Sequence, residues 1–218
     1  MRTLVIGNKA YSSWSLRPWL MLKHGGLPFD EVRIPLYRPD SAAPLAHWSP
    51  SGKVPVLHDD GLVIWESLAI LEYLAETYPD ACGWPRDRAA RAFARAASAE
   101  MASSFSALRY SMPFNCRARR RVTLGDDAQR DVARVAALWS ECRSRFGRGG
   151  EWLFGTFSPA DAMYAPVALR FVTYGIALDG AASAYVASIA AHPAVQEWIA
   201  AGRTEVEVID SNEVGTPA

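Results

Sequence analysis

The sequence predicts a small α/β domain followed by a larger all-helical domain. Residues 1–79 alternate short apolar, β-branched runs with helical patterns, in the order βαβ and then ββα. After residue 85 the hydrophobic periodicity is helical almost throughout, and the stretch between the two parts lacks it. We therefore assign residues 1–79 to the first domain, 80–85 to a linker, 86–203 to the helical domain and 204–218 to a C-terminal tail.

The elements of the first domain follow from local signals. Thr3–Ile6 is an apolar, β-branched run, and Ser15–His24 has a helical pattern that Gly25-Gly26 ends. The remaining expected elements are three strands and a closing helix, at Glu31–Leu36, Val54–Leu57, Leu62–Ile64 and Ser67–Tyr78. A crossover helix implies that the first two strands are parallel, whereas a tight turn at 59–61 implies that the last two are antiparallel.

The second domain consists of helical patterns separated by short breaks. The expected helices are Arg86–Tyr110, Asp126–Phe146, Pro159–Tyr174, Ala181–Ala191 and Pro193–Ala201. Gly147–Gly150 interrupts the pattern after the second of these. Because the tail is polar and acidic, we expect it to be poorly ordered or draped over the surface.

Composition excludes several classes of function. The 218 residues are 50% hydrophobic and 21% charged, which is typical of a folded globular protein. Lys plus Arg and Asp plus Glu both number 23, so bulk charge gives no attraction to nucleic acid or to an anionic membrane. No apolar run approaches the roughly 18 residues of a membrane span. We expect a cytoplasmic protein with no nucleic acid or membrane partner.

The metal-ligating residue types show no ligand spacing. Cys82, Cys116 and Cys142 lie far apart with no CxxC pair, which fits neither a disulfide framework nor a zinc site. The four histidines are likewise scattered. We expect ordinary thiols and no metal.

The most informative segment of the first domain is the loop after its first strand. Tyr11 to Pro18 places the hydroxyls of Ser12, Ser13 and Ser15 at the start of a helix. Free N–H groups and a partial positive charge at a helix N-terminus favour an anion or an ionised thiolate. The alternative is that one of these serines only caps the helix.

Two further junctions complete a possible binding site. If Pro55 is cis, the backbone of Val54 is turned outward and can bind an extended peptide by strand-like pairing. At the next strand-to-helix junction, Glu66 can accept from an ammonium group and Ser67 can hold a carboxylate, or Ser67 can simply cap the helix. Together these features predict a site for a small zwitterionic peptide whose thiol lies near the serines.

Three motifs of the first domain occur in a specific order: Ser-Ser-Trp-Ser-Leu-Arg, Lys-Val-Pro-Val-Leu and Glu-Ser-Leu-Ala-Ile-Leu-Glu-Tyr-Leu. This ordered set resembles the serine-type members of the glutathione transferase family, including the zeta and theta-like classes. The resemblance covers the chain up to the tail. It implies a thioredoxin-like N-terminal domain and an all-α C-terminal domain. Phe154–Ala162 resembles the folding box of that family, in which Ser158 and Asp161 have capping-box spacing and a structural role.

The resemblance implies roles for the glutathione-binding residues. Glu66 and Ser67 would hold the γ-glutamyl group, and the Val54 backbone would pair with the cysteinyl unit ahead of a cis Pro55. Lys53 would pair with the glycyl carboxylate.

The resemblance also implies a catalytic serine that donates a hydrogen bond to the glutathione sulfur and stabilises its thiolate. Counted back from Arg17, the zeta-like alignment gives this place to Ser12, which we favour, whereas theta-like spacing gives it to Ser13. Trp14 stands where the zeta pattern has cysteine, which weakens an assignment as maleylacetoacetate isomerase. Tyr11 is a third candidate, because tyrosine-type members exist.

The electrophile site of such proteins lies between the domains, so the helix Arg86–Tyr110 should line it. The expected electrophile-binding residues are Tyr11, Trp14, Ser104, Phe105, Arg109 and Tyr110. Phe105 has a competing interpretation as a core residue.

The expected activity is conjugation of the glutathione thiolate to a small hydrophobic electrophile, as in detoxification, by a homodimer that uses glutathione as co-substrate. The alternatives are glutathione-dependent isomerisation of the maleylacetoacetate isomerase kind, peroxide reduction, and non-catalytic binding of glutathione or another ligand.

Overall fold

The computed structural model describes all 218 residues and contains a four-stranded mixed sheet in the order β2-β1-β3-β4. Strand β1 (Thr3–Ile6) is parallel to β2 (Asp30–Arg33) and antiparallel to β3 (Val56–Asp59). The edge strand β4 (Leu62–Ile64) pairs antiparallel with β3. The predicted βαβ-ββα order is confirmed.

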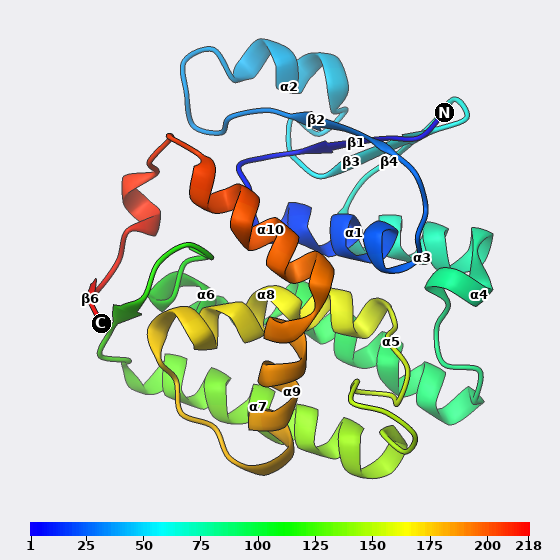
Figure 1. Ribbon diagram of the computed structural model, residues 1–218, viewed down its shortest axis with the longest axis vertical. Coiled ribbons are helices and arrows are strands. Elements are labelled where there is room, and N and C mark those ends of the chain that lie inside the picture. Colours follow the sequence, from blue (N-terminus) through cyan, green and yellow to red (C-terminus); the bar gives the residue numbers. More distant parts are fainter.

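Helices cover both faces of this sheet (Figure 1). Helix α2 (Ala42–Trp48) lies above the sheet in this view, and α1 (Ser13–His24) and α3 (Ser67–Thr77) lie below it. The alternation of β1 explains the two layers, because Val5 packs towards α2 whereas Leu4 joins the main core.

The rest of the chain is mainly helical, which confirms the predicted all-α C-terminal part (Figure 1). Its helices are α4 (Pro79–Cys82), α5 (Arg88–Ser103), α6 (Ser106–Ser111), α7 (Asp126–Phe146), α8 (Pro159–Tyr174), α9 (Gly180–Ala191) and α10 (Pro193–Thr204). Helix α8 is buried along almost its whole length and packs against α1, α5 and α9. It therefore joins the helical region to the sheet-containing region.

The structure departs from the expected elements in four places. The predicted helix 86–110 is broken into α5 and α6, because Phe105 adopts a left-handed conformation with φ 58°. Strand β2 ends before Leu36, whose backbone N–H instead donates to Asn8 Oδ1. Helix α4 overlaps the predicted linker, and α2 lies where no element was expected.

The C-terminal segment, residues 205–218, has defined structure. A 3₁₀ turn (Asp210–Asn212) is followed by β6 (Thr216–Pro217), which pairs with β5 (Arg120–Arg121). Ile209 is buried against Ala10 and Tyr11 of the loop after β1. Of the two expectations for the tail, only a segment draped over the surface fits this arrangement.

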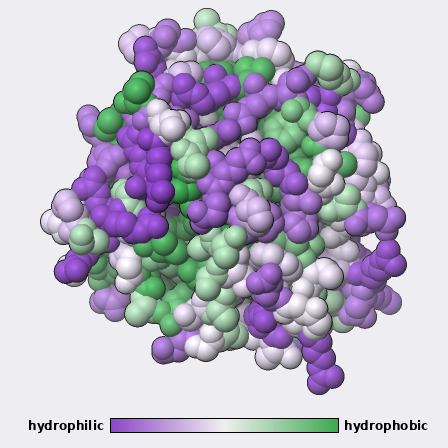
Figure 2. Space-filling model, in the orientation of Figure 1, coloured by the Kyte–Doolittle hydropathy of each residue, from purple (hydrophilic) through white to green (hydrophobic).

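Hydrophilic residues cover much of the face shown in Figure 2, with hydrophobic ones in patches between them. No helix combines the length and the apolar character needed to cross a membrane. No cluster of three or more His, Cys, Asp or Glu side chains is placed to hold a metal ion.

Candidate active site

A cavity of about 620 Å³ lies between the loop after β1, the segment before β3 and the helical region. Seven residues predicted for the site line it: Tyr11, Ser12, Ser13, Trp14, Lys53, Val54 and Arg109. The structure thus brings together the first-loop serines and the Lys-Val pair, which are about forty residues apart in the sequence.

The two candidate serines have different hydrogen bonds. Ser12 precedes α1, and its Oγ donates to Ser15 Oγ at 2.7 Å and accepts from the Ser15 N–H at 3.4 Å. Ser13 Oγ accepts from Arg170 Nη2 at 3.3 Å and makes no other hydrogen bond. The hydroxyl proton of Ser12 is therefore committed to Ser15 Oγ while its oxygen caps the helix, whereas the hydroxyl proton of Ser13 is available to a ligand in the cavity.

Three guanidinium groups surround Trp14 and Ser13. Arg17 Cζ lies 3.7 Å and Arg109 Cζ 5.6 Å from the centroid of the Trp14 ring, and Arg170 contacts Ser13. Burial and repulsion from neighbouring guanidinium groups lower the pKa of both Arg17 and Arg170. No carboxylate forms an ion pair with any of the three, so positive charge accumulates around Trp14 and Ser13.

Two of these guanidinium groups are held by main-chain oxygens. Arg170 Nε donates to Met112 O at 2.7 Å, and Arg17 Nε donates to Met163 O at 3.1 Å. Both Nη atoms of Arg17 are buried without a hydrogen-bond partner. Neutral acceptors fix the orientation of these groups but do not cancel their charge.

The hydroxyl of Tyr11 is not free to bind a thiol, because two other side chains already hydrogen-bond to it. Its hydroxyl donates to Glu213 Oε1 at 2.6 Å and accepts from the Arg117 guanidinium. Burial and the Glu213 carboxylate raise the pKa of Tyr11. Although its ring lines the cavity, its hydroxyl is engaged by the C-terminal segment.

Only some of the residues expected to hold glutathione line the cavity. The Val54–Pro55 peptide bond is cis, and both Lys53 and Val54 line the cavity. Ser67 Oγ donates to Trp14 O at 3.0 Å, which ties the start of α3 to the first loop. Glu66 is exposed beside it, and neither Glu66 nor Ser67 borders the cavity.

The other expected electrophile-binding residues lie outside this cavity. Ser104 and Phe105 are at the break between α5 and α6, and Phe105 turns into the core, where it is 4% exposed. Tyr110, on α6, is 88% exposed and borders an adjoining cavity that also contains Arg109.

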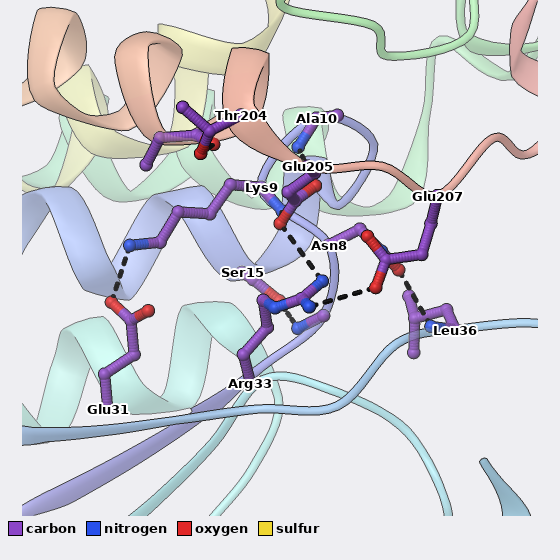
Figure 3. Close-up of polar contacts among 12 residues, drawn as sticks. Asn8, Lys9, Ala10, Ser15, Glu31, Arg33, Leu36, Thr204, Glu205 and Glu207 are labelled. Atoms are coloured by element: carbon purple, nitrogen blue, oxygen red, sulfur yellow. Dashed lines mark hydrogen bonds and ion pairs between the residues drawn. The ribbon is translucent and has the colours of Figure 1, made fainter. Parts of the chain in front are cut away.

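The C-terminal segment holds the loop that precedes the two serines. Glu205 accepts from the backbone N–H of Lys9 at 2.7 Å and of Ala10 at 3.0 Å. Figure 3 shows Arg33 between Glu205 and Glu207, with Nη2 donating to Glu207 at 2.9 Å. The Glu205 carboxylate therefore accepts hydrogen bonds from the two backbone N–H groups at the start of the loop.

Replacing Glu205 with alanine should destabilise the protein by about 2 kcal/mol, because two largely buried N–H groups lose a charged acceptor. Urea unfolding measures the loss, and faster hydrogen exchange at Lys9 and Ala10 should accompany it. Glu197→Ala, which removes an exposed ion pair with Lys23, is the matched control. If both variants lower the free energy of unfolding equally, the contact of Glu205 with the loop stabilises the protein no more than an exposed ion pair does.

Nine of the sixteen residues that line the cavity were absent from the sequence-based prediction, and three of them matter most to the site: Arg170, Ile209 and Asn212. The sequence did carry a signal for Arg170, since it is the only basic residue in the mainly apolar α8. Ile209 and Asn212 had none, because they lie in a polar tail that becomes part of the site only through folding.

Known proteins resemble both halves of the chain. The model of the glutathione S-transferase N-terminal domain matches residues 11–77, and that of the C-terminal domain matches residues 125–201. A Burkholderia glutathione transferase homolog, solved with bound glutathione, is 27% identical over 94% of this chain and 99% of that chain, with a TM-score of 0.71. An unclassified glutathione S-transferase from Bombyx mori has the same fold, at 20% identity and a TM-score of 0.72 over 93% of this chain and 94% of its own.

The similarity to curated relatives is partial. A probable maleylacetoacetate isomerase from Caenorhabditis elegans is 41% identical over 96 residues, which are 44% of this chain and 44% of that protein. The rat maleylacetoacetate isomerase is 37% identical over 99 residues, 44% of this chain and 45% of its own. The matched stretch thus spans less than half of either relative. Because the two domain models together cover most of the chain, and a full-length structural relative agrees with them, the chain belongs to the glutathione S-transferase family.

Proposed function

We propose that this protein binds glutathione in the 620 Å³ cavity, ionises its thiol and transfers the thiolate to a small electrophile. Ser13 is the residue that hydrogen-bonds to the sulfur. The observation that carries this proposal is the pairing of a cavity-lining hydroxyl with the buried cation of Arg170. The bound glutathione of the Burkholderia homolog supports the choice of co-substrate.

The remaining contacts of glutathione involve two residues that line the cavity and two at the start of α3, outside its lining. The Val54 backbone pairs with the cysteinyl unit, and Lys53 binds the glycyl carboxylate. Glu66 and Ser67, at the start of α3, receive the γ-glutamyl group. These placements are part of the proposal.

Ionisation of the thiol is the step to which the protein contributes most. The thiol proton leaves to solvent, and the Ser13 hydroxyl donates to the resulting thiolate while its oxygen accepts from Arg170. An ordinary thiol has a pKa of about 8.5, so each unit by which this environment lowers it is worth about 1.4 kcal/mol. The thiolate then attacks the electrophilic carbon, forming an S–C bond by addition or with departure of a leaving group.

A second candidate is glutathione-dependent cis–trans isomerisation. The partial identity to two proteins named as maleylacetoacetate isomerases favours it. The same thiolate would add to the substrate and leave again, so glutathione would not be consumed. Trp14 stands in the loop where the zeta pattern has cysteine, which favours conjugation.

The homodimer expected from the resemblance is also part of the proposal. Strand β4 is the edge of the sheet and exposes Leu62, Val63 and nearby Trp65. Apolar side chains along an edge strand are typical of a surface that another subunit covers.

The proposal is tested by ultraviolet titration of glutathione bound to the wild type, Ser13→Ala and Ser12→Ala. The wild type should show thiolate absorbance near neutral pH. Ser13→Ala should raise the thiol pKa by about 1–2 units while still binding glutathione, because a charge-assisted hydrogen bond of about 1.5–3 kcal/mol is lost. Ser12→Ala should change mainly the stability of α1. If the wild type binds glutathione without ionising it, a non-catalytic binding role replaces the proposal.

A further inference from the structure

A second cavity, of about 970 Å³, adjoins the thiol cavity. Arg109, Pro113 and Asn212 border both cavities, so the two are continuous at these residues. The second cavity lies between α6, β5 and the C-terminal segment (residues 205–218). A ligand longer than a small ring would therefore extend from the thiol towards this space.

The charges around the two cavities are strongly one-sided. The chain as a whole has equal numbers of acidic and basic residues. No Asp or Glu borders either cavity, whereas four basic residues do: Lys53, Arg109, Arg121 and Arg170. Lys53 and Arg170 are already assigned to glutathione and Ser13, which leaves Arg121 and Arg109, the latter expected from the sequence to bind the electrophile, for the second substrate.

The guanidinium groups of Arg109 and Arg121 also differ from those of their neighbours. Arg120 forms an ion pair with Glu213, and Arg117 lies 3.8 Å from the same carboxylate. Neither Arg109 nor Arg121 has a side-chain hydrogen bond or an ion pair, although Arg109 is half-buried against Trp14. A partly buried charge without a partner is costly, and an anionic ligand would remove that cost.

We propose that the electrophile is an anion: its reactive carbon lies beside Ser13, and its carboxylate is bound by Arg109 at the junction and by Arg121 in the second cavity. This assignment rests on the proposed function and replaces the expected small hydrophobic electrophile with a carboxylate-bearing one. The hydroxyl groups of Ser111, Thr123 and Thr216, which border the second cavity, supply further donors.

The test compares 4-chloro-3,5-dinitrobenzoate with its uncharged methyl ester. In both, the glutathione thiolate forms an S–C bond at the ring carbon and chloride leaves with the C–Cl electron pair. With each kcat/KM divided by the uncatalysed rate, the wild type should prefer the benzoate by about tenfold, as expected for one charge-assisted contact. Arg109→Gln should abolish the preference, Arg121→Gln should reduce it, and Arg109→Lys should retain part of it. Arg119→Gln, an exposed arginine that borders neither cavity, is the control.

Calorimetric binding of the two preformed glutathione conjugates separates this inference from the proposed function. Tighter binding of the carboxylate conjugate, lost in Arg109→Gln, supports the inference even where turnover is slow. Equal binding of both conjugates by the wild type overturns the anion site and leaves the glutathione site intact. If neither conjugate binds, both the proposed function and this inference are wrong.

Discussion

Replacing Asp161 with alanine is expected to lower the free energy of unfolding by about 3–5 kcal/mol, because two buried donors each lose an acceptor at a cost of about 1–3 kcal/mol and a cavity is left. This carboxylate is fully buried at the start of α8. It accepts from the backbone N–H of Leu153 at 3.0 Å and of Ser158 at 2.9 Å, and from the Ser158 hydroxyl at 3.1 Å. Alanine would leave two buried N–H donors without acceptors and open a cavity beneath the loop. Urea unfolding measures the difference.

Ser158→Ala is the matched control, because it removes only the hydroxyl and should cost about 1 kcal/mol. If Ser158→Ala costs as much as Asp161→Ala, the cap and not the carboxylate is responsible. If either variant melts like the wild type but loses turnover, the structural role is wrong.

The pH dependence gives a second measure of the same carboxylate. Burial raises the pKa of Asp161 from 3.8 to about 6, although its hydrogen bonds oppose the shift. Between these values the folded protein binds more protons at this site than the unfolded chain. The contribution of Asp161 to stability should therefore fall as the pH rises from about 4 to about 6, and Asp161→Ala should lack this component.

Local signals account for the parts of the fold that the sequence predicted best. Helices α7 and α8 begin and end where expected, because a glycine follows the first and a Ser-Pro pair opens the second. The break at Phe105 was not predicted, since its left-handed conformation depends on packing into the core and no glycine marks it. Helix α2 was missed because it has no fully buried residue and hence little periodicity.

The candidate site, like the fold, was predictable from the sequence only in part. The motifs that contain Ser12, Ser13, Lys53 and Val54 were recognisable as short patterns, and the structure places all four around one cavity. The sequence favoured Ser12 from spacing alone. The difference between the two hydroxyls comes partly from the local bond of Ser12 to Ser15 and partly from the bond of Ser13 to a residue 157 positions away, and no local pattern encodes the second.

Arg170→Met is expected to have the largest effect on activity. Arg170 is 4% exposed, and its Nη2 donates to Ser13 Oγ at 3.3 Å. Because its charge is not paired with a carboxylate, it should favour the thiolate over the thiol when glutathione is bound. Its removal should raise the thiol pKa by about 1–2 units, and kcat/KM near pH 6.5 should fall about tenfold for each unit.

The pH profile separates this effect from a loss of folding. Above the thiol pKa of both proteins, glutathione is ionised without assistance, so Arg170→Met should approach the wild-type kcat near pH 9.5. Arg170→Lys keeps the charge but not the full set of bonds to Met112 O and Ser13 Oγ. Its kcat/KM near pH 6.5 should therefore lie between those of the wild type and Arg170→Met. A deficit in activity that is equal at all pH values, with a matching drop in urea stability, would mean that Arg170 only supports the packing of α8.

A Ser13→Ala/Arg170→Met double variant should lose less transition-state stabilisation than the sum of the two single variants, because both side chains act on the same sulfur through one hydrogen bond.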